Sequence, residues 1–191
     1  MKVKLGMLLL LIVIGFPALA KIETSKLRQQ AEIKITTYKH QLNATLKANI
    51  ELGGLKRGIS GCDSVAKNMA IQSTTEGWEL RRTSLKIRNP KNAPTPWEEI
   101  QLKAFRRGIE DGKAINQLRV EKLTSIRPNL VSYKYMKAIT AEAVCLNCHG
   151  TQLSDDVKQH LSKQFPNDLA TGYEVGDLMG AFTLEKVANI E

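Results

Sequence analysis

The sequence predicts an α+β domain in which helices flank an antiparallel sheet. Three observations support this prediction. Apolar side chains recur every three or four residues over residues 24–52, which is the period of a long amphipathic helix. Polar and apolar residues alternate from Trp78 onwards, which is the period of a strand, and further strand-like stretches follow later in the chain. Shorter helical stretches separate these strands, and the combination favours the α+β class.

The first twenty residues have the pattern of a secretory signal peptide. Lys2 and Lys4 precede an apolar run over residues 5–16, and the small-residue pattern Ala18-Leu19-Ala20 closes it. The run of about twelve residues is shorter than the ~20 that span a bilayer, so we expect cleavage after Ala20 rather than an uncleaved anchor. Residues 21–191 would then form a single domain, and no later stretch is apolar enough to span a membrane.

The composition narrows the possible functions. The chain has 191 residues, of which 42% are hydrophobic and 25% charged, so a large multidomain enzyme and a disordered chain are excluded. The net charge is +9, and loss of Lys2 and Lys4 with the signal would leave +7. No nucleic-acid motif, glycine-rich phosphate loop or Ser-His-acid set accompanies this charge, so we expect no nucleic-acid partner.

The N-terminal half is expected to contain two helices and one strand. The first helix, residues 24–52, can be capped by Thr24 or Ser25 and ends at Gly53-Gly54. A shorter helix over residues 61–71 places Cys62 on its inward face, together with Met69. The alternation that starts at Trp78 continues to Arg88 and predicts a strand, which ends at the proline-rich loop 89–96.

The C-terminal half is expected to begin with a helix at Pro96, with acidic residues in its first turn and an end near residues 108–112. Weak strands are expected over residues 114–122 and 130–139, and a turn-rich segment over residues 145–150. A helix over residues 155–165 and a last strand over residues 178–187 complete the chain.

The clearest chemical signal is Cys145-Leu146-Asn147-Cys148-His149, which matches the C-x-x-C-H motif of covalent c-type haem attachment. Two thiols one helical turn apart can reach the two vinyl groups on one edge of a porphyrin, and the adjacent histidine can bind the iron. Export also suits this chemistry, because thioether attachment takes place outside the cytoplasm. The motif therefore predicts one covalent haem c and a periplasmic location.

Three other readings of these cysteines remain open. Cys145 and Cys148 could form a disulfide, which leaves His149 and Cys62 unexplained. They could form a thioredoxin-like redox pair, which needs a βαβ setting. Cys62, Cys145, Cys148 and His149 could also bind zinc, although adjacent ligands at positions 148 and 149 are unusual for a structural zinc site.

A second axial ligand to the haem iron is expected from a short set of candidates. We favour Cys62, because it is the remaining thiol and lies on the inward stripe of a helix, although a small buried cysteine is the ordinary alternative. A thiolate ligand would lower the reduction potential. The other candidates are Met69, Met136, Met179, His40 and His160.

Basic residues on the predicted strand are candidates for binding the haem propionates. Arg82, Lys86 and Arg88 fall on one face, where charged groups could pair with carboxylates, and a solvated charged face is the alternative. Trp97 could pack on the porphyrin, and a core position is its ordinary alternative.

Several segments together resemble the PAS-like c-type haem domain family, which occurs in stand-alone periplasmic cytochromes, such as the photosystem-II-associated one, and in sensory kinases and chemoreceptors. The resemblance covers about residues 27–188. It rests on residues 61–63, 82–90 and 92–98, on Cys145 to Gly150, and on residues 165–168, 172–173 and 176–181. The sequence departs from the family at Thr95, where an acidic or small residue often precedes the Pro-Trp pair.

The resemblance implies an antiparallel PAS-like sheet with flanking helices and a haem bound through Cys145 and Cys148. It also implies His149 and Cys62 as axial ligands. We therefore expect a periplasmic monohaem cytochrome that transfers electrons or holds a redox poise, rather than an enzyme. Its positive charge would steer it to an acidic redox partner protein. The alternative is a haem-based sensor of redox state or of a diatomic gas that acts through a separate signalling protein.

Overall fold

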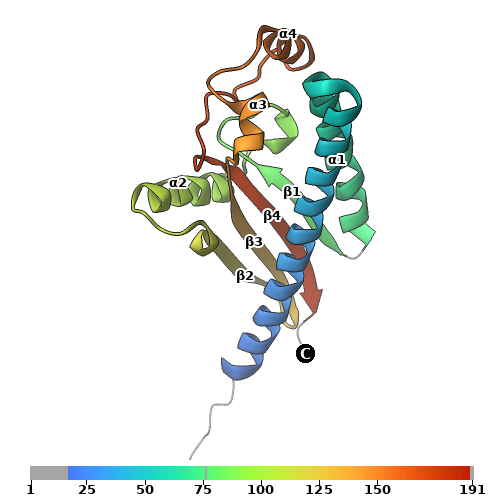
Figure 1. Ribbon diagram of the computed structural model, residues 1–191. Helices are drawn as coiled ribbons and strands as arrows, with labels where there is room; N and C mark the ends of the chain where they lie inside the picture. Colours follow the sequence, from blue (N-terminus) through green and yellow to red (C-terminus); the bar gives the residue numbers. More distant parts are fainter. Residues whose placement is uncertain (1–16, 76, 190–191) are drawn as a thin grey trace, which may run out of the picture.

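The computed structural model describes residues 17–75 and 77–189, with side chains described for residues 24–61 and 77–189. Four strands form one antiparallel sheet: β1 Trp78–Thr83, β2 Arg119–Arg127, β3 Leu130–Thr140 and β4 Leu178–Asn189. Their order across the sheet is β1-β4-β3-β2. Helix α1 covers one face of the sheet and helix α2 the other (Figure 1), which confirms the expected α+β class.

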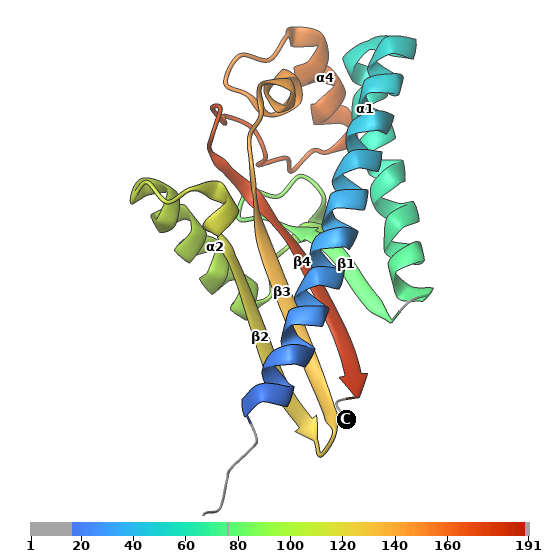
Figure 2. The same cartoon turned by 60° about the horizontal axis from the view of Figure 1, so that its bottom comes forward.

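Helix α1 spans Pro17–Thr75 and folds back on itself at Gly53 and Gly54, which have non-helical backbone angles. Gly54 has φ +69°, a left-handed conformation that glycine adopts at little cost. The first arm therefore ends where the sequence predicts. The second arm starts directly after this turn, rather than near residue 61, and runs back beside the first arm (Figure 2).

The two arms of α1 approach closely because Gly58 carries no side chain. A Cβ atom at this position would lie 2.8 Å from Cγ1 of Ile50 on the first arm. Arg57 Nε also donates a hydrogen bond of 3.4 Å to Asn49 Oδ1 across the pair. The second arm is thereby held against the first.

The first arm of α1 packs on the sheet through one continuous apolar core. Its buried stripe of Leu27, Ala31, Ile35 and Tyr38 contacts alternate residues of three strands. These strand residues point to one face because successive side chains of a strand alternate. They are Trp78, Leu80, Tyr133, Tyr135, Phe182 and Leu184.

Helix α2, Pro96–Glu110, covers the opposite face of the sheet, and its start agrees with the sequence prediction. Thr95 caps the helix in a reciprocal capping box with Glu98, which explains why threonine stands before the Pro-Trp pair. Trp97 packs on the cluster of Leu102, Phe105, Leu118 and Met136. Trp97 is therefore partly buried against the core beneath α2, which is the ordinary role given as the alternative to packing on the porphyrin.

Strands β1 and β2 differ from the sequence prediction in their boundaries. β1 ends at Thr83, and residues 84–88 form a loop with bends at 85, 86 and 88, in which Ser84 N–H bonds to the carbonyl of Asn92 at 3.1 Å. Alternating polar and apolar residues also occur in a loop without a ladder partner, so sequence periodicity alone does not distinguish this loop from a strand. β2 spans Arg119–Arg127 rather than 114–122: Ile115–Gln117 forms a 3₁₀ turn, η2, and the strand pairs with β3 as far as Arg127.

The segment after β3 forms the short turns that carry the Cys-x-x-Cys-His sequence. These are a 3₁₀ turn at Ala143–Cys145 (η3) and helix α3 at Leu146–His149. Helix α4, Asp155–Gln164, follows as expected, and its Val157 and Leu161 pack on Ile59 of the second arm of α1. A further 3₁₀ turn, η1, occupies Pro90–Asn92 in the proline-rich loop.

Most of the expected signal segment, residues 1–20, lies outside the described residues. None of the helices in the described part of the chain has the length and apolar character that a membrane span needs.

Candidate functional site

A cavity of about 820 Å³ lies between the two arms of α1, the Cys-x-x-Cys-His turn and the end of the sheet formed by residues 82–83, 137–140 and 179–182. Cofactor and ligand sites commonly have volumes of ~300–1,000 Å³, so the cavity is large enough for a sizeable cofactor. Its wall is largely apolar. The apolar lining comes from both arms of α1, from the strands and from the loops, and includes Leu42, Leu46, Ile50, Ile59, Ile139, Phe165 and Phe182.

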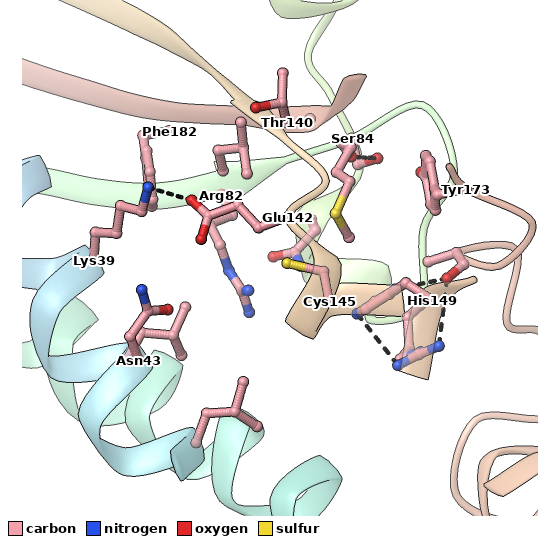
Figure 3. Close-up of a pocket in the computed structure, with 18 of the residues that line it drawn as sticks. Lys39, Asn43, Arg82, Ser84, Thr140, Glu142, Cys145, His149, Tyr173 and Phe182 are labelled. Carbon is pink, nitrogen blue, oxygen red and sulfur yellow. Dashed lines mark hydrogen bonds and ion pairs between the residues drawn. The ribbon is translucent and has the colours of Figure 1, made fainter. Parts of the chain in front are cut away.

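Cys145, Cys148 and His149 all line this cavity. The turn that carries them is held by backbone hydrogen bonds, from Cys145 N–H to the Glu142 carbonyl and from Gly150 N–H to the Leu146 carbonyl, both 2.9 Å. The two cysteines therefore stand one helical turn apart on the same wall. Figure 3 shows Cys145 and His149 pointing into the space opposite α1.

The segment with Gly172 and Tyr173 also forms hydrogen bonds with this turn. Tyr173 N–H bonds to the His149 carbonyl at 3.0 Å, and Gly172 N–H bonds to the Gly150 carbonyl at 3.1 Å. The Tyr173 ring, which also lines the cavity, meets the His149 ring edge to face with a centroid distance of 6.4 Å. The ring plane of His149 is thus constrained on one side by an aromatic neighbour.

His149 is held as a neutral imidazole. Burial, and after it the nearby Arg88 guanidinium, lower the pKa of His149 to about 4. Its Nδ1 lies 2.7 Å from the carbonyl oxygen of Ala170, which can only accept, so Nδ1 carries the proton. Nε2 then keeps its lone pair. A neutral imidazole with one nitrogen bonded to a backbone carbonyl is the usual form of a metal-ligating histidine.

Arg88 lines the cavity but is engaged with protein groups. Its Nε donates to Asp168 Oδ2 at 2.9 Å and its Nη2 to the Cys148 carbonyl at 2.7 Å, while Nη1 lies 3.5 Å from His149 Nε2. The side chains of Arg88 and Asp168 are only 13% and 9% exposed. Arg88 is thus tied to the motif turn itself.

Arg82 differs from the other cations of the cavity. It follows Trp78 and Leu80 on the α1 face of β1, and Figure 3 shows its guanidinium reaching into the cavity between Asn43 and Cys145. Among the described residues, no hydrogen-bond or ion-pair partner is found for the Arg82 side chain, whose backbone belongs to the β1–β4 pair. Lys86, in contrast, donates to the Thr171 carbonyl and lies over the Tyr173 ring at 4.3 Å.

The candidates for a second axial ligand fall in different places. Met179 and His40 line the cavity. Met136 is fully buried in the cluster beneath α2 on the other face of the sheet, and His160, on α4, is not among the lining residues. The side chains of Cys62 and Met69 lie outside the described set.

Two of the alternative readings can be compared with the fold. All three strand pairings of the described sheet are antiparallel, so it contains no βαβ unit of the kind a thioredoxin-like pair needs. No group of three or more His, Cys, Asp or Glu side chains among those described could hold a metal ion. Cys62, which the zinc reading requires, is not in that set.

Asp168, Ala170 and Tyr173 are site residues that were not identified individually from the sequence. They position His149 and the loops around it, through the contacts given above and through a hydrogen bond of 2.8 Å from Ala170 N–H to Asp168 Oδ1. Asp168 and Tyr173 do fall in the segments that carry the family resemblance, and this was the available signal.

The fold and the site together define a class of protein: a PAS-like α+β domain with a Cys-x-x-Cys-His turn at a cavity beside its sheet. The sequence model of the Tll0287-like family matches residues 20–185, and the chain belongs to this family. It is similar to the crystal structure of the cyanobacterial haem-protein Tll0287, with a TM-score of 0.58 and 24% identity. That alignment covers 85% of this chain and 97% of the other, and it establishes the fold. No curated protein matches the chain.

Proposed function

We propose that this chain is a c-type cytochrome, with one haem joined covalently to Cys145 and Cys148 and His149 as an axial ligand. The observation that carries the proposal is that both thiols and a neutral imidazole meet on one wall of a largely apolar cavity of about 820 Å³. The solved structure that it resembles is described as a haem-protein, which supports the proposal.

The charges of the cavity suit a dianionic cofactor such as haem with its two propionates. Among the described residues, five cationic side chains line the cavity, against one carboxylate, Glu142. Four of them are engaged with protein groups: Lys39, Lys86, Arg88 and Lys137. Arg82 remains, and we assign it to a propionate, where a charge-assisted hydrogen bond would form.

The second axial ligand is proposed to be Cys62. The second arm of α1 brings Gly58 and Ile59 to the cavity wall, and position 62 lies one helical turn after Ile59 on the same arm. If Cys62→Ser leaves the absorption spectrum and reduction potential unchanged, this assignment is wrong.

Bound haem would supply a one-electron iron centre whose potential is set by its axial ligands and surroundings. The chain's own residues would hold the macrocycle, shield it with apolar side chains and keep His149 neutral and oriented. We propose that the protein transfers electrons or holds a redox poise in the periplasm, and that its partner is an acidic protein. A haem-based sensor is the alternative, and reaction of the reduced protein with carbon monoxide separates the two, because a gas must displace an axial ligand.

The attachment can be tested by export of the chain in a host with c-type maturation machinery. The wild-type protein should keep its haem after denaturation, and its alkaline pyridine spectrum should be that of haem with two thioether bonds. Cys145→Ser and Cys148→Ser should each shift that spectrum to a single thioether or lose the haem. Haem that is extracted from the wild-type protein by denaturant would contradict the proposal.

The role of Arg82 has its own control on the neighbouring position. Arg81 lies on the same strand, but its side chain pairs with Glu98 beneath α2. Arg82→Gln should lower the midpoint potential, because removal of a cation near the haem favours the oxidised iron. Arg81→Gln should leave the potential unchanged, and equal effects of the two substitutions would contradict the assignment.

A further inference from the structure

We infer that the end of the molecule formed by the β2–β3 hairpin and the start of α1 binds the surface of an anionic lipid bilayer. The hairpin comprises residues 119–134, and Figure 1 and Figure 2 both show its turn beside the start of α1. Two contacts agree with this placement: Leu27 of α1 packs in one core with Tyr133, and Arg28 Nε lies 3.6 Å from Glu121 Oε2. The inference uses no property of the proposed haem site.

The hairpin is unusually exposed for part of a four-stranded sheet. Eight of the nine residues of β2 are exposed, and Val120 is partly buried. Leu123 and Ile126 are 39% and 53% exposed, and Val187, on the same end of β4 opposite Ser132, is 53% exposed. Scattered apolar residues on a surface are ordinary, but these three lie at one projecting end of the sheet.

Helix α2 does not reach this end of the sheet. Its core cluster contains strand residues of the opposite end, namely Met136, Ala138 and Ala181. Among the described elements, none covers the hairpin end on the α2 face (Figure 2). The hairpin end is therefore available as a contact surface.

The hairpin also carries an excess of positive charge. Residues 119–134 contain four cationic residues and one carboxylate, Glu121, which already pairs with Arg28. Lys122 and Arg127 are exposed, and no ion-pair or hydrogen-bond partner is found for their side chains within the described part of the chain. Exposed apolar side chains interleaved with such cations are typical of surfaces that lie among the headgroups of an anionic bilayer.

The chain enters the domain at this same end. Helix α1 begins at Pro17, and the apolar run over residues 5–16 directly precedes it in the sequence. Until the expected cleavage after Ala20, an exported chain is attached to the membrane through that run, so its attachment and the hairpin share one end of the molecule. After cleavage, the hairpin would keep this end at the lipid surface.

This orientation would turn the cavity away from the bilayer. The cavity lies at the end of the sheet formed by residues 82–83, 137–140 and 179–182. The hairpin turn lies at the other end of the sheet, because β3 runs from the turn towards the cavity. A partner protein in solution would then have access to the cavity side of a membrane-bound molecule.

A second copy of this chain is the competing occupant, since β2 is at the edge of the sheet and its outer side pairs with no described strand. The charges favour lipid. Pairing of two copies through β2 would bring their excess cations together, and like charges on opposed strands are destabilising. An anionic bilayer attracts the same cations.

The first test is co-sedimentation of the exported protein with vesicles at about 0.1 M salt, where weak long-range attraction is largely screened. Vesicles of phosphatidylglycerol and phosphatidylethanolamine should bind the protein, and vesicles of phosphatidylcholine alone should not. Lys122→Gln and Arg127→Gln should each weaken binding by about 5-fold, the effect expected for one cation beside an anionic bilayer. Ile126→Ser should weaken it as well, through loss of apolar contact with the lipid.

Matched controls lie on α2 and on the loop that follows it. Ile100 is 61% exposed on α2, and Lys113 is exposed directly after it. Ile100→Ser and Lys113→Gln change the same kinds of side chain away from the hairpin, so they should leave vesicle binding unchanged.

Hydrogen–deuterium exchange locates the contact. On addition of the anionic vesicles, peptides from residues 119–134 should exchange more slowly, while peptides from α2 should not change. This readout applies whether or not residues 1–20 have been removed from the exported protein.

The inference is overturned if the wild-type protein does not bind the anionic vesicles, if the control substitutions weaken binding as much as those in the hairpin, or if the vesicles protect another part of the chain. Protection of the hairpin that rises with protein concentration without vesicles, together with a dimer in light scattering, would also overturn it, because that result identifies a second copy as the occupant. Haem attachment is tested separately by the mass and spectrum of the same protein, so the two proposals can fail independently.

Discussion

Glu98 offers the sharpest test of how the sheet that carries the site is held to α2. Its side chain is only 5% exposed. One carboxylate oxygen accepts from Thr183 Oγ1 at 2.7 Å, and the other accepts from Thr95 N–H at 2.8 Å and pairs with Arg81. Burial alone would raise the pKa of Glu98, but these hydrogen bonds and the Arg81 charge outweigh it and hold the pKa below its ordinary value.

Replacement of Glu98 by glutamine removes the charge and turns one acceptor into a donor. Hydrogen bonds to a charged group contribute ~1.5–3 kcal/mol each, and broken buried pairs cost ~3–5 kcal/mol, so Glu98→Gln should lower the free energy of unfolding by about 2–4 kcal/mol at pH 7. The measurement is urea denaturation followed by circular dichroism. Glu99→Gln is the control: Glu99 pairs with Lys103 on the exposed side of the same helix and should change stability by less than ~0.5 kcal/mol.

The effect of Glu98 should also depend on pH with a defined sign. A carboxyl whose pKa is lower in the folded state stabilises the fold fully above its unfolded pKa of about 4.5, and this contribution declines as pH falls through the folded value. The difference between wild type and Glu98→Gln should therefore shrink below about pH 4.5. A difference that is as small as that of Glu99→Gln at pH 7, or one that stays constant down to acid pH, would refute the reasoning.

Two further predictions concern glycines beside the cavity. Gly58→Val should force the arms of α1 apart and lower the free energy of unfolding, measured by urea denaturation, by ~1–3 kcal/mol. Ser60→Val is the control, because Ser60 is exposed on the same arm, and it should have little effect. Equal effects of the two substitutions would contradict the close packing of the arms. Gly180 has φ +157°, and a Cβ atom at this position would lie 2.3 Å from the Thr83 carbonyl oxygen. Gly77 also has a positive φ, +75°, but a Cβ atom there would have no neighbouring atom within 4 Å. Gly180→Ala should therefore lower the midpoint temperature of thermal unfolding more than Gly77→Ala does. A larger effect at Gly77 would show that steric contact at β4 is not the dominant cost.

The helical and strand periods predicted most elements but not all their boundaries. The break at Gly53-Gly54, the start of α2 and the late strands follow from local signals. A helix was expected to begin at residue 61, yet the second arm of α1 begins directly after Gly54, so Gly58 and Gly61 lie inside it. Their purpose is a close approach to residues of the first arm, which is a tertiary contact that a local pattern does not contain.

The cavity residues were predictable to different degrees. Cys145, Cys148 and His149 were identified because their spacing is itself the signal. Arg88 was interpreted with Arg82 as one charged face, but the structure pairs it with Asp168, 80 residues away. Alternation along a strand gives the face of a residue and not its partner, so the two arginines could not be distinguished from the sequence.

The most direct test of the central claim is the intact mass of the exported protein, measured together with its absorption spectrum in the oxidised and reduced states. We predict the mass of the chain from residue 21 onwards plus one haem, kept under denaturing conditions, and a reduced spectrum typical of c-type haem. A mass without haem, or haem that is lost on denaturation, would contradict the claim. Cys145 and Cys148 would then be interpreted as a disulfide pair or as zinc ligands.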